Sequence, residues 1–168
     1  EPHVQKLIFN FCNGGNILDI GANYGQHTIF MSKLFPNSNI TAIEASAGNI
    51  EILKESIDFN SCTNINIIQA FLSDYEKEIE YCYWPELSAC AFGCTTDYAE
   101  VQHKEYKTIV KTQKLDDIID FEPDFIKMDI EGAEFDTLHG GVRTFSKCPP
   151  LMLELNNFTS TEFYDRHV

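Results

Sequence analysis

Closely spaced glycines and polar residues occur in "ILDIGANYGQHT", residues 17–28, a pattern that predicts a short strand, a turn and the start of a helix. A dinucleotide fingerprint has G-x-G-x-x-G, whose glycines let the backbone approach a pyrophosphate, but here Asn23 replaces the second glycine. Gly21 and Gly25 still permit a tight turn with exposed backbone N–H groups before a helix, which suits one carboxylate. Asp19, just before the turn, suits an ammonium. We therefore expect the loop to hold the amino-acid end of a ligand.

Acidic residues also stand at the end of every expected strand. They are Asp19, then Glu44 beside Ala45, then Ser73 with Asp74, then Asp129 with Glu131, and finally Glu154 with Asn156. In open α/β sheets ligands bind at the carboxyl ends of the strands. Carboxylates gathered at such an edge favour a cationic or hydroxyl-rich ligand and disfavour a phosphate.

The spacing of these acids suggests which ligand they bind. Glu44, at the end of the second strand, is placed to accept both hydroxyls of a ribose. Asp74 is placed to accept from an adenine amino group. An amino acid, a ribose and an adenine together describe S-adenosylmethionine, which we expect to be the cofactor. We assign its binding to Asp19, Gly21, Ala22, Asn23, Gly25, Glu44, Ala45, Ser73, Asp74 and Asp129.

Methyl transfer to a hydroxyl also needs a base beside the methyl group. The fourth strand lies next to the first in a doubly wound sheet, so Asp129 and Glu131 are the candidate catalytic residues, with Glu134 a turn further on. Glu131 has a second explanation, because a carboxylate at a helix N-terminus is stabilised by the helix dipole. His27 and His139 are further candidate bases, or surface and helix histidines.

Several other features leave alternatives open. Oxygen ligands at Asp129, Glu131, Glu154 and Asn156 suit Mg²⁺ or Ca²⁺, but the acids are explained without an ion and we predict no metal. The aromatic residues Tyr81, Tyr83, Trp84 and Phe92 either wall an acceptor pocket or pack within a sheet. Tyr24 either closes over the cofactor or lies on the surface.

The chain must supply strands and helices that bring these residues together. Apolar periodicity predicts strands at 16–20, 39–45, 65–74, 124–130 and 149–155, and an antiparallel insertion at 78–114 with a loop at 88–97. The same periodicity predicts three helices by their apolar faces, which are Ile29, Phe30 and Leu34, then Ile50, Leu53 and Ile57, and then Leu138, Val142 and Phe145. It also predicts a short helix at 115–121. A capping box at Thr159 and Glu162 predicts the start of a last helix. Alternating strands and helices indicate an α/β fold with a parallel sheet.

Composition sets the broad class of the protein. The 168 residues include 12 basic and 26 acidic side chains, a formal charge of -14 that disfavours nucleic acid as a partner. No apolar run is long enough for a membrane span. The six cysteines are scattered, so we expect reduced thiols and a cytoplasmic location. We expect one domain over 1–168, trimmed at its C-terminus.

The motifs resemble those of the FkbM-type methyltransferases, a class I family that depends on S-adenosylmethionine. The resemblance covers about Asn16 to Asn156 in five blocks: "LDIGANYG", "AIEAS", "AFLSD", "TQKLDDII" and "FIKMDIEGAEFDTLHGG". The last block, with its K-x-D-x-E-G-A-E core, is the most specific. Ser46 stands where the family commonly has proline.

This resemblance implies a doubly wound, Rossmann-like class I sheet of seven strands, whose final strands have no counterpart before Val168. It also implies cofactor contacts at the matching positions and O-methylation of a sugar, lipid or small metabolite. Two alternatives remain. One is a non-catalytic nucleoside-binding or scaffold domain, since a fold alone does not fix function. The other is an NAD-dependent oxidoreductase, which would share the sheet and the ribose carboxylate.

Overall fold

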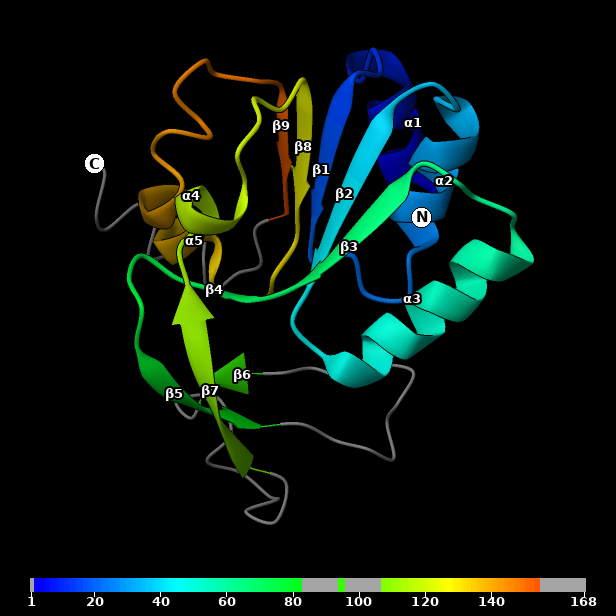
Figure 1. Cartoon of the computed structure of the whole chain (residues 1–168). Helices are drawn as coiled ribbons and strands as arrows, with labels where there is room; N and C mark the ends of the chain where they lie inside the picture. Colours follow the sequence, from blue (N-terminus) through cyan, green and yellow to red (C-terminus); the bar gives the residue numbers. More distant parts are fainter. Residues whose placement is uncertain (1, 83–93, 96–106, 155–168) are drawn as a thin grey trace.

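The computed structural model describes residues 2–82, 94–95 and 107–154, and its centre is a parallel sheet of five strands (Figure 1). The strands are β1 (Asn16–Ile20), β2 (Asn39–Glu44), β3 (Ile65–Gln69), β8 (Phe125–Met128) and β9 (Leu151–Leu153), in the order β3-β2-β1-β8-β9. All four pairings are parallel. The expected α/β sheet is confirmed, and the strand order reverses beside β1, where such folds bind ligands.

Helices cover both faces of the sheet. Val4, Ile8 and Met31 pack against Ile17, Ile40 and Phe125 on one face, from α1 (Pro2–Phe11) and α2 (Gln26–Leu34). The helix α3 (Ala47–Phe59) covers the same face through Leu53, which packs on Ala42. Short helices α4 (Leu115–Ile118) and α5 (Glu134–Gly140) cover the other face. Successive side chains of β1 therefore pack in two different cores, because side chains along a strand point alternately to the two faces of the sheet.

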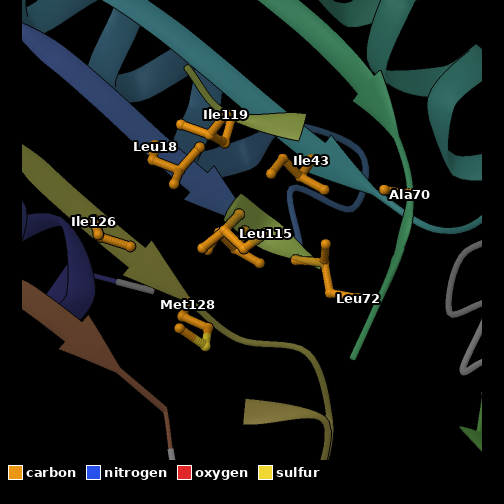
Figure 2. Packing of buried hydrophobic residues seen from close by; sticks show 9 residues of the cluster. Leu18, Ile43, Ala70, Leu72, Leu115, Ile119, Ile126 and Met128 are labelled. Carbon is orange, nitrogen blue, oxygen red and sulfur yellow. The ribbon is translucent and has the colours of Figure 1, made fainter. Parts of the chain in front are cut away.

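The core beneath α4 and α5 consists mainly of apolar side chains. Figure 2 shows Leu18, Ile43, Ile126 and Met128 of the main sheet around Leu115 of α4. Leu115 is 0% exposed and Ile119 is 2% exposed. Burial of such side chains contributes roughly 1.5 to 3 kcal/mol each, so this core fixes the position of α4 on the sheet.

A second sheet lies beyond the carboxyl edge of the first (Figure 1). It contains β4 (Phe71–Leu72), β5 (Glu78–Cys82), β6 (Cys94–Thr95) and β7 (Lys107–Gln113) in the order β4-β7-β5-β6. The pairing of β5 with β7 and β6 is antiparallel, as expected for the insertion. One continuous strand over 65–74 is wrong, because the chain leaves the main sheet at Ala70 and β4 pairs with β7. The prediction of a loop throughout 88–97 is also wrong, since β6 lies within it.

Two helix predictions need correction, and one helix was not predicted. The fully buried residues of α2 are Thr28, Met31 and Ser32, whereas Ile29, Phe30 and Leu34 are partly buried. Of these three, Phe30 packs against the core beneath α1, as expected. Val142 is 68% exposed because α5 ends at Gly140, although Leu138 and Phe145 pack on the core as expected. The helix α1 was not predicted. The capping box at Thr159 and Glu162 lies outside the described residues.

No helix in the described part of the chain is both long and apolar enough to cross a membrane.

Candidate functional site

The loop after β1, residues 21–25, is shaped by backbone conformations that suit glycine. Gly21 has φ 79°, and a Cβ added there would lie 1.8 Å from the carbonyl oxygen of Asp129. Gly25 has φ 89°, and an added Cβ would lie 2.3 Å from Leu53 Cδ1. Asn23 has φ 53°, which asparagine tolerates better than most residues. The two glycines thus allow the loop to touch the turn after β8 on one side and α3 on the other.

Most amides of this loop already have partners within the protein. Gly21 N and Ala22 N donate to Ile43 O at 2.9 and 3.0 Å, and Gly25 N donates to Ala22 O at 2.9 Å. Asn23 N donates to a carboxylate oxygen of Glu44 at 2.8 Å. The expectation of exposed N–H groups is therefore wrong for these four residues, because three of the amides donate to β2 and the amide of Gly25 closes the turn.

The Glu44 carboxylate lies where the loop after β1 meets the start of α3. Besides Asn23, it accepts from Ser46 N at 2.9 Å and from Asn49 Nδ2 at 3.2 Å, both through Oε1. Ser46, at the position where the resembling family commonly has proline, is the N-cap of α3 and accepts from Asn49 N at 3.4 Å. Glu44 is 8% exposed, and because a carboxylate oxygen can accept more than one hydrogen bond, Oε2 can accept from a ligand hydroxyl as well as from Asn23 N.

Asp19 is more deeply buried than its position at the end of a strand suggested. It is 0% exposed, and its Oδ2 accepts from the hydroxyl of Thr28 at 2.6 Å. Its Oδ1 lies 3.3 Å from the ammonium of Lys127, which is paired with Asp19 in the register of β1 and β8. Lys127 also donates to Gly21 O at 2.9 Å. Direct contact between Asp19 and a ligand ammonium stays a prediction, while its contacts here serve the loop.

The turn after β8 brings a second carboxylate to the same edge. Asp129 has a side chain that is 33% exposed, and its Oδ2 lies 4.0 Å from Lys127 Nζ. Glu131 is exposed and has φ 53°. Glu134 is 1% exposed, and its carboxylate accepts from Ile130 N and Gly132 N at 2.9 to 3.2 Å. The carboxylate of Glu134, the first residue of α5, therefore stabilises the turn that leads into this helix.

Ser73 and Asp74 lie in a separate group beside α5. Ser73 Oγ is 3.0 Å from Asp74 Oδ1 and 3.4 Å from Asp136 Oδ2. Lys77 lies 3.5 Å from Asp74 and 3.6 Å from Asp136. Burial raises the pKa of Asp74, but the hydrogen bond from Ser73 and the charge of Lys77 outweigh it, so this pKa is below its ordinary value. Asp74 thus stays ionised and able to accept a hydrogen bond.

The remaining candidates are less informative. His139 is exposed in the last turn of α5, and His27 and Tyr24 are partly buried. Glu154 is exposed, whereas Asn156, Tyr83, Trp84 and Phe92 lie outside the described residues. Within the described ranges, no three His, Cys, Asp or Glu side chains are placed to hold a metal ion.

Two pockets lie at the amino edge of the sheet, opposite the edge that carries Glu44 and Asp129. One is bordered by residues 122–124, 143–144 and 147–150, and the other by residues 13–15 and 34–38.

The structure thus unites the loop after β1, Glu44 and Asp129, and it adds two residues that the sequence reasoning missed. Lys127 was missed although a lysine between apolar neighbours in "FIKMDI" signals a buried charge that needs a partner. Asn49 was missed because an asparagine near a helix start is usually explained by capping.

Comparison with known proteins is consistent with this arrangement. Residues 19–167 match the family model described as the Methyltransferase FkbM domain. "Methyltransferase 1" of Beauveria bassiana is 23% identical over 146 residues, covering 74% of this chain and 57% of that protein. "Methyltransferase sdnD" of Sordaria araneosa is 25% identical over 166 residues, covering 79% of this chain and 62% of that protein. Shorter matches of 29% identity include ribosomal RNA methyltransferases.

The fold comparison agrees. The crystal structure of methyltransferase FkbM from Methylobacillus flagellatus superposes with a TM-score of 0.57 and 23% identity, covering 83% of this chain and 32% of that one. The chain spans about three fifths of the curated relatives named above. The sheet order, the loop after β1 and the family match lead to one conclusion: this chain has a Rossmann-like class I methyltransferase fold and belongs to the FkbM methyltransferase domain family.

Proposed function

We propose that the protein transfers the methyl group of S-adenosylmethionine to a hydroxyl of a sugar, a lipid or a small metabolite. The observation that carries this proposal is the 2.8 Å hydrogen bond from Asn23 N to Glu44. It joins the loop after β1 to Glu44, the acid that would bind the ribose, and Asp129 lies against Gly21 at the other end of the loop. That order matches the order of groups along the donor.

The residues would divide the work of binding. Glu44 Oε2 would accept from a ribose hydroxyl while Asn23 and Asn49 hold the carboxylate in place. Asp74, ionised beside Lys77, would accept from the adenine amino group. Asp129 would face the amino-acid end of the donor. Such fixed groups lower the cost of aligning two reactants, which is worth roughly 7 to 11 kcal/mol in well-oriented reactions.

The chemical step needs alignment and a base. The bound cofactor supplies an electrophilic methyl group on a sulfonium. Transfer to the acceptor oxygen would form an O–CH₃ bond as the S–CH₃ bond breaks, with S-adenosylhomocysteine as the second product. We assign the acceptor proton to the carboxylate of Glu131 or Asp129, which flank the turn after β8. A positioned base of this kind adds about 10² to 10⁴ in rate.

The acceptor class rests on charge. A net charge of -14 disfavours an anionic polymer, which argues against nucleic acid even though some matched relatives are ribosomal RNA methyltransferases. We propose a hydroxylated acceptor of low charge and a cytoplasmic reaction.

Binding of the donor can be tested by thermal unfolding with S-adenosylmethionine, S-adenosylhomocysteine and NAD in parallel. A ligand at about 100 times its Kd stabilises the folded protein by roughly 2.7 kcal/mol. We expect a shift with the first two ligands and none with NAD. A shift with NAD alone would support an oxidoreductase, and no shift with any ligand would support a scaffold domain.

Glu44→Ala is the matching variant for the ribose assignment, and Glu51→Ala is its control. Glu51 is an exposed glutamate of α3 that pairs with Lys54. We expect the shift with S-adenosylhomocysteine to vanish in the first variant and to persist in the second. An unchanged shift in folded Glu44→Ala would show that Glu44 does not bind the ribose.

A further inference from the structure

A buried cation lies beneath the loop after β1. Lys127 is 5% exposed, and its ammonium has three oxygen neighbours on two strands and their following turns. These are Gly21 O at 2.9 Å, Asp19 Oδ1 at 3.3 Å and Asp129 Oδ2 at 4.0 Å. The division of work proposed above leaves Lys127 without a role.

The three neighbours occupy different parts of the site. Gly21 O lies at the point where the chain turns from β1 into the loop. The Asp129 carboxylate lies at the carboxyl edge of the sheet and is partly exposed. Asp19 is closed off from solvent, so it connects Lys127 to Thr28 of α2. The ammonium of Lys127 is therefore the group that links the start of the loop to the acid of the turn after β8.

We propose that Lys127 is a positioning residue of the donor site. By holding the Gly21 carbonyl and the Asp129 carboxylate in fixed relation, it sets the affinity for the nucleoside sulfonium. This inference rests on the proposed function, because it concerns the same site. Lys127 donates a hydrogen bond to Gly21 O and is close enough to the two carboxylates for ionic attraction, which suits the compact charge of a lysine head group.

The rival explanation is that Lys127 only neutralises the buried Asp19. Removing one partner of a buried ion pair leaves an uncompensated charge, so Lys127→Met alone is a poor test. The informative comparison is between Asp19→Asn and the double variant Asp19→Asn with Lys127→Met. Both lack the carboxylate of Asp19, and they differ only in the ammonium.

The measurement is the Kd of S-adenosylhomocysteine by isothermal titration calorimetry, with urea unfolding to verify that each variant folds. If Lys127 positions the site, the double variant binds at least about tenfold more weakly than Asp19→Asn, as expected when a hydrogen-bonded anchor is lost. If it only neutralises Asp19, the two variants bind equally, which would overturn the inference. Lys54→Met, at an exposed lysine paired with Glu51, is the control and should bind as the wild type does.

A further variant decides the question if either Asp19 variant fails to fold or to bind. Lys127→Arg keeps the charge but places its donors in a planar fork. The inference predicts weaker binding by about tenfold, and binding equal to that of the wild type would overturn it. Failure of the wild type to bind S-adenosylhomocysteine would instead overturn the proposed function together with this inference, so the two failures are distinguishable.

Discussion

At the scale of single residues, Gly21 is the described glycine at which an added Cβ would come closest to another atom. Replacement by alanine would force a Cβ to within 1.8 Å of Asp129 O at a φ of 79°. We expect Gly21→Ala to lower the free energy of unfolding by about 3 kcal/mol or more, because strain of roughly 1 to 3 kcal/mol adds to displacement of the neighbouring backbone. Urea unfolding measures this difference.

Gly132→Ala is the control for backbone strain alone. Gly132 has φ 112°, but no atom lies within 4 Å of an added Cβ. We expect it to cost roughly 1 to 3 kcal/mol from backbone conformation alone. Equal losses in the two variants would show that the contact between Gly21 and Asp129 contributes nothing beyond backbone conformation.

The sequence allowed part of this site to be predicted. The alignment of strand ends in a parallel sheet places Asp19, Glu44 and Asp129 at one edge, and this follows from strand order alone. Their depth does not follow, because burial of Asp19 depends on Thr28 of α2 and Lys127 of β8. Contacts between residues 106 positions apart, as from Lys127 to Gly21, have no local signal in the sequence.

At the scale of elements, Asp116 ties α4 to the segment after α5. Its carboxylate accepts from Arg143 N at 2.8 Å and from Thr144 N and Oγ1 at 2.9 and 2.7 Å. Burial raises the pKa of Asp116, but these hydrogen bonds and the charge of Arg143 outweigh it, so the pKa in the folded protein is below its ordinary value. The ionised carboxylate therefore stabilises the fold.

A pH dependence follows from this direction. A lowered pKa in the folded state gives stability that is present above the unfolded value of about 3.9 and is lost as the pH falls through the folded value. We expect Asp116→Asn to lower the free energy of unfolding by about 1 to 3 kcal/mol at pH 7, and the difference from wild type to shrink below pH 4. Urea unfolding at pH 7 and pH 3 measures it. Asp117→Asn, at an exposed neighbour on α4, should change stability little at either pH.

Most of the strands and helices could be predicted from the sequence, and the exceptions have physical reasons. Strands at 16–20 and 39–44 follow from dense β-branched and apolar runs. The division of 65–74 at Ala70 could not be read, because whether a residue pairs in one sheet or another depends on a partner, Gln113, that is distant in sequence. The end of α5 at Gly140 was signalled by Gly140 and Gly141, but the apolar spacing suggested a longer helix. In that case the glycines were the better indicator.

At the scale of the whole molecule, the net charge of -14 should oppose folding. Like charges destabilise a compact state, and added salt screens them beyond about 10 Å at 0.1 M. We expect the Tm at pH 8 to rise by about 2 to 4 °C between 0.02 and 0.3 M NaCl, equivalent to roughly 1 kcal/mol for a chain of this size.

The same titration with salt at pH 5 is the control. At that pH histidines gain protons and carboxylates begin to do so, which reduces the negative charge. The rise should therefore be smaller. An equal rise at both values of pH would indicate a general effect of salt on the protein surface and not relief of repulsion.

The pairing of Asp19 with Lys127 across β1 and β8 has a consequence for how the sheet assembles. Because side chains alternate between faces, a slip of one residue would turn Lys127 towards the apolar core that contains Leu18 and Met128. In that position the ammonium would no longer pair with the Asp19 carboxylate. An unpaired charge in an apolar core costs more free energy than imperfect packing does. The ion pair thus favours the observed alignment of β1 and β8 over a slip of one residue at the centre of the sheet.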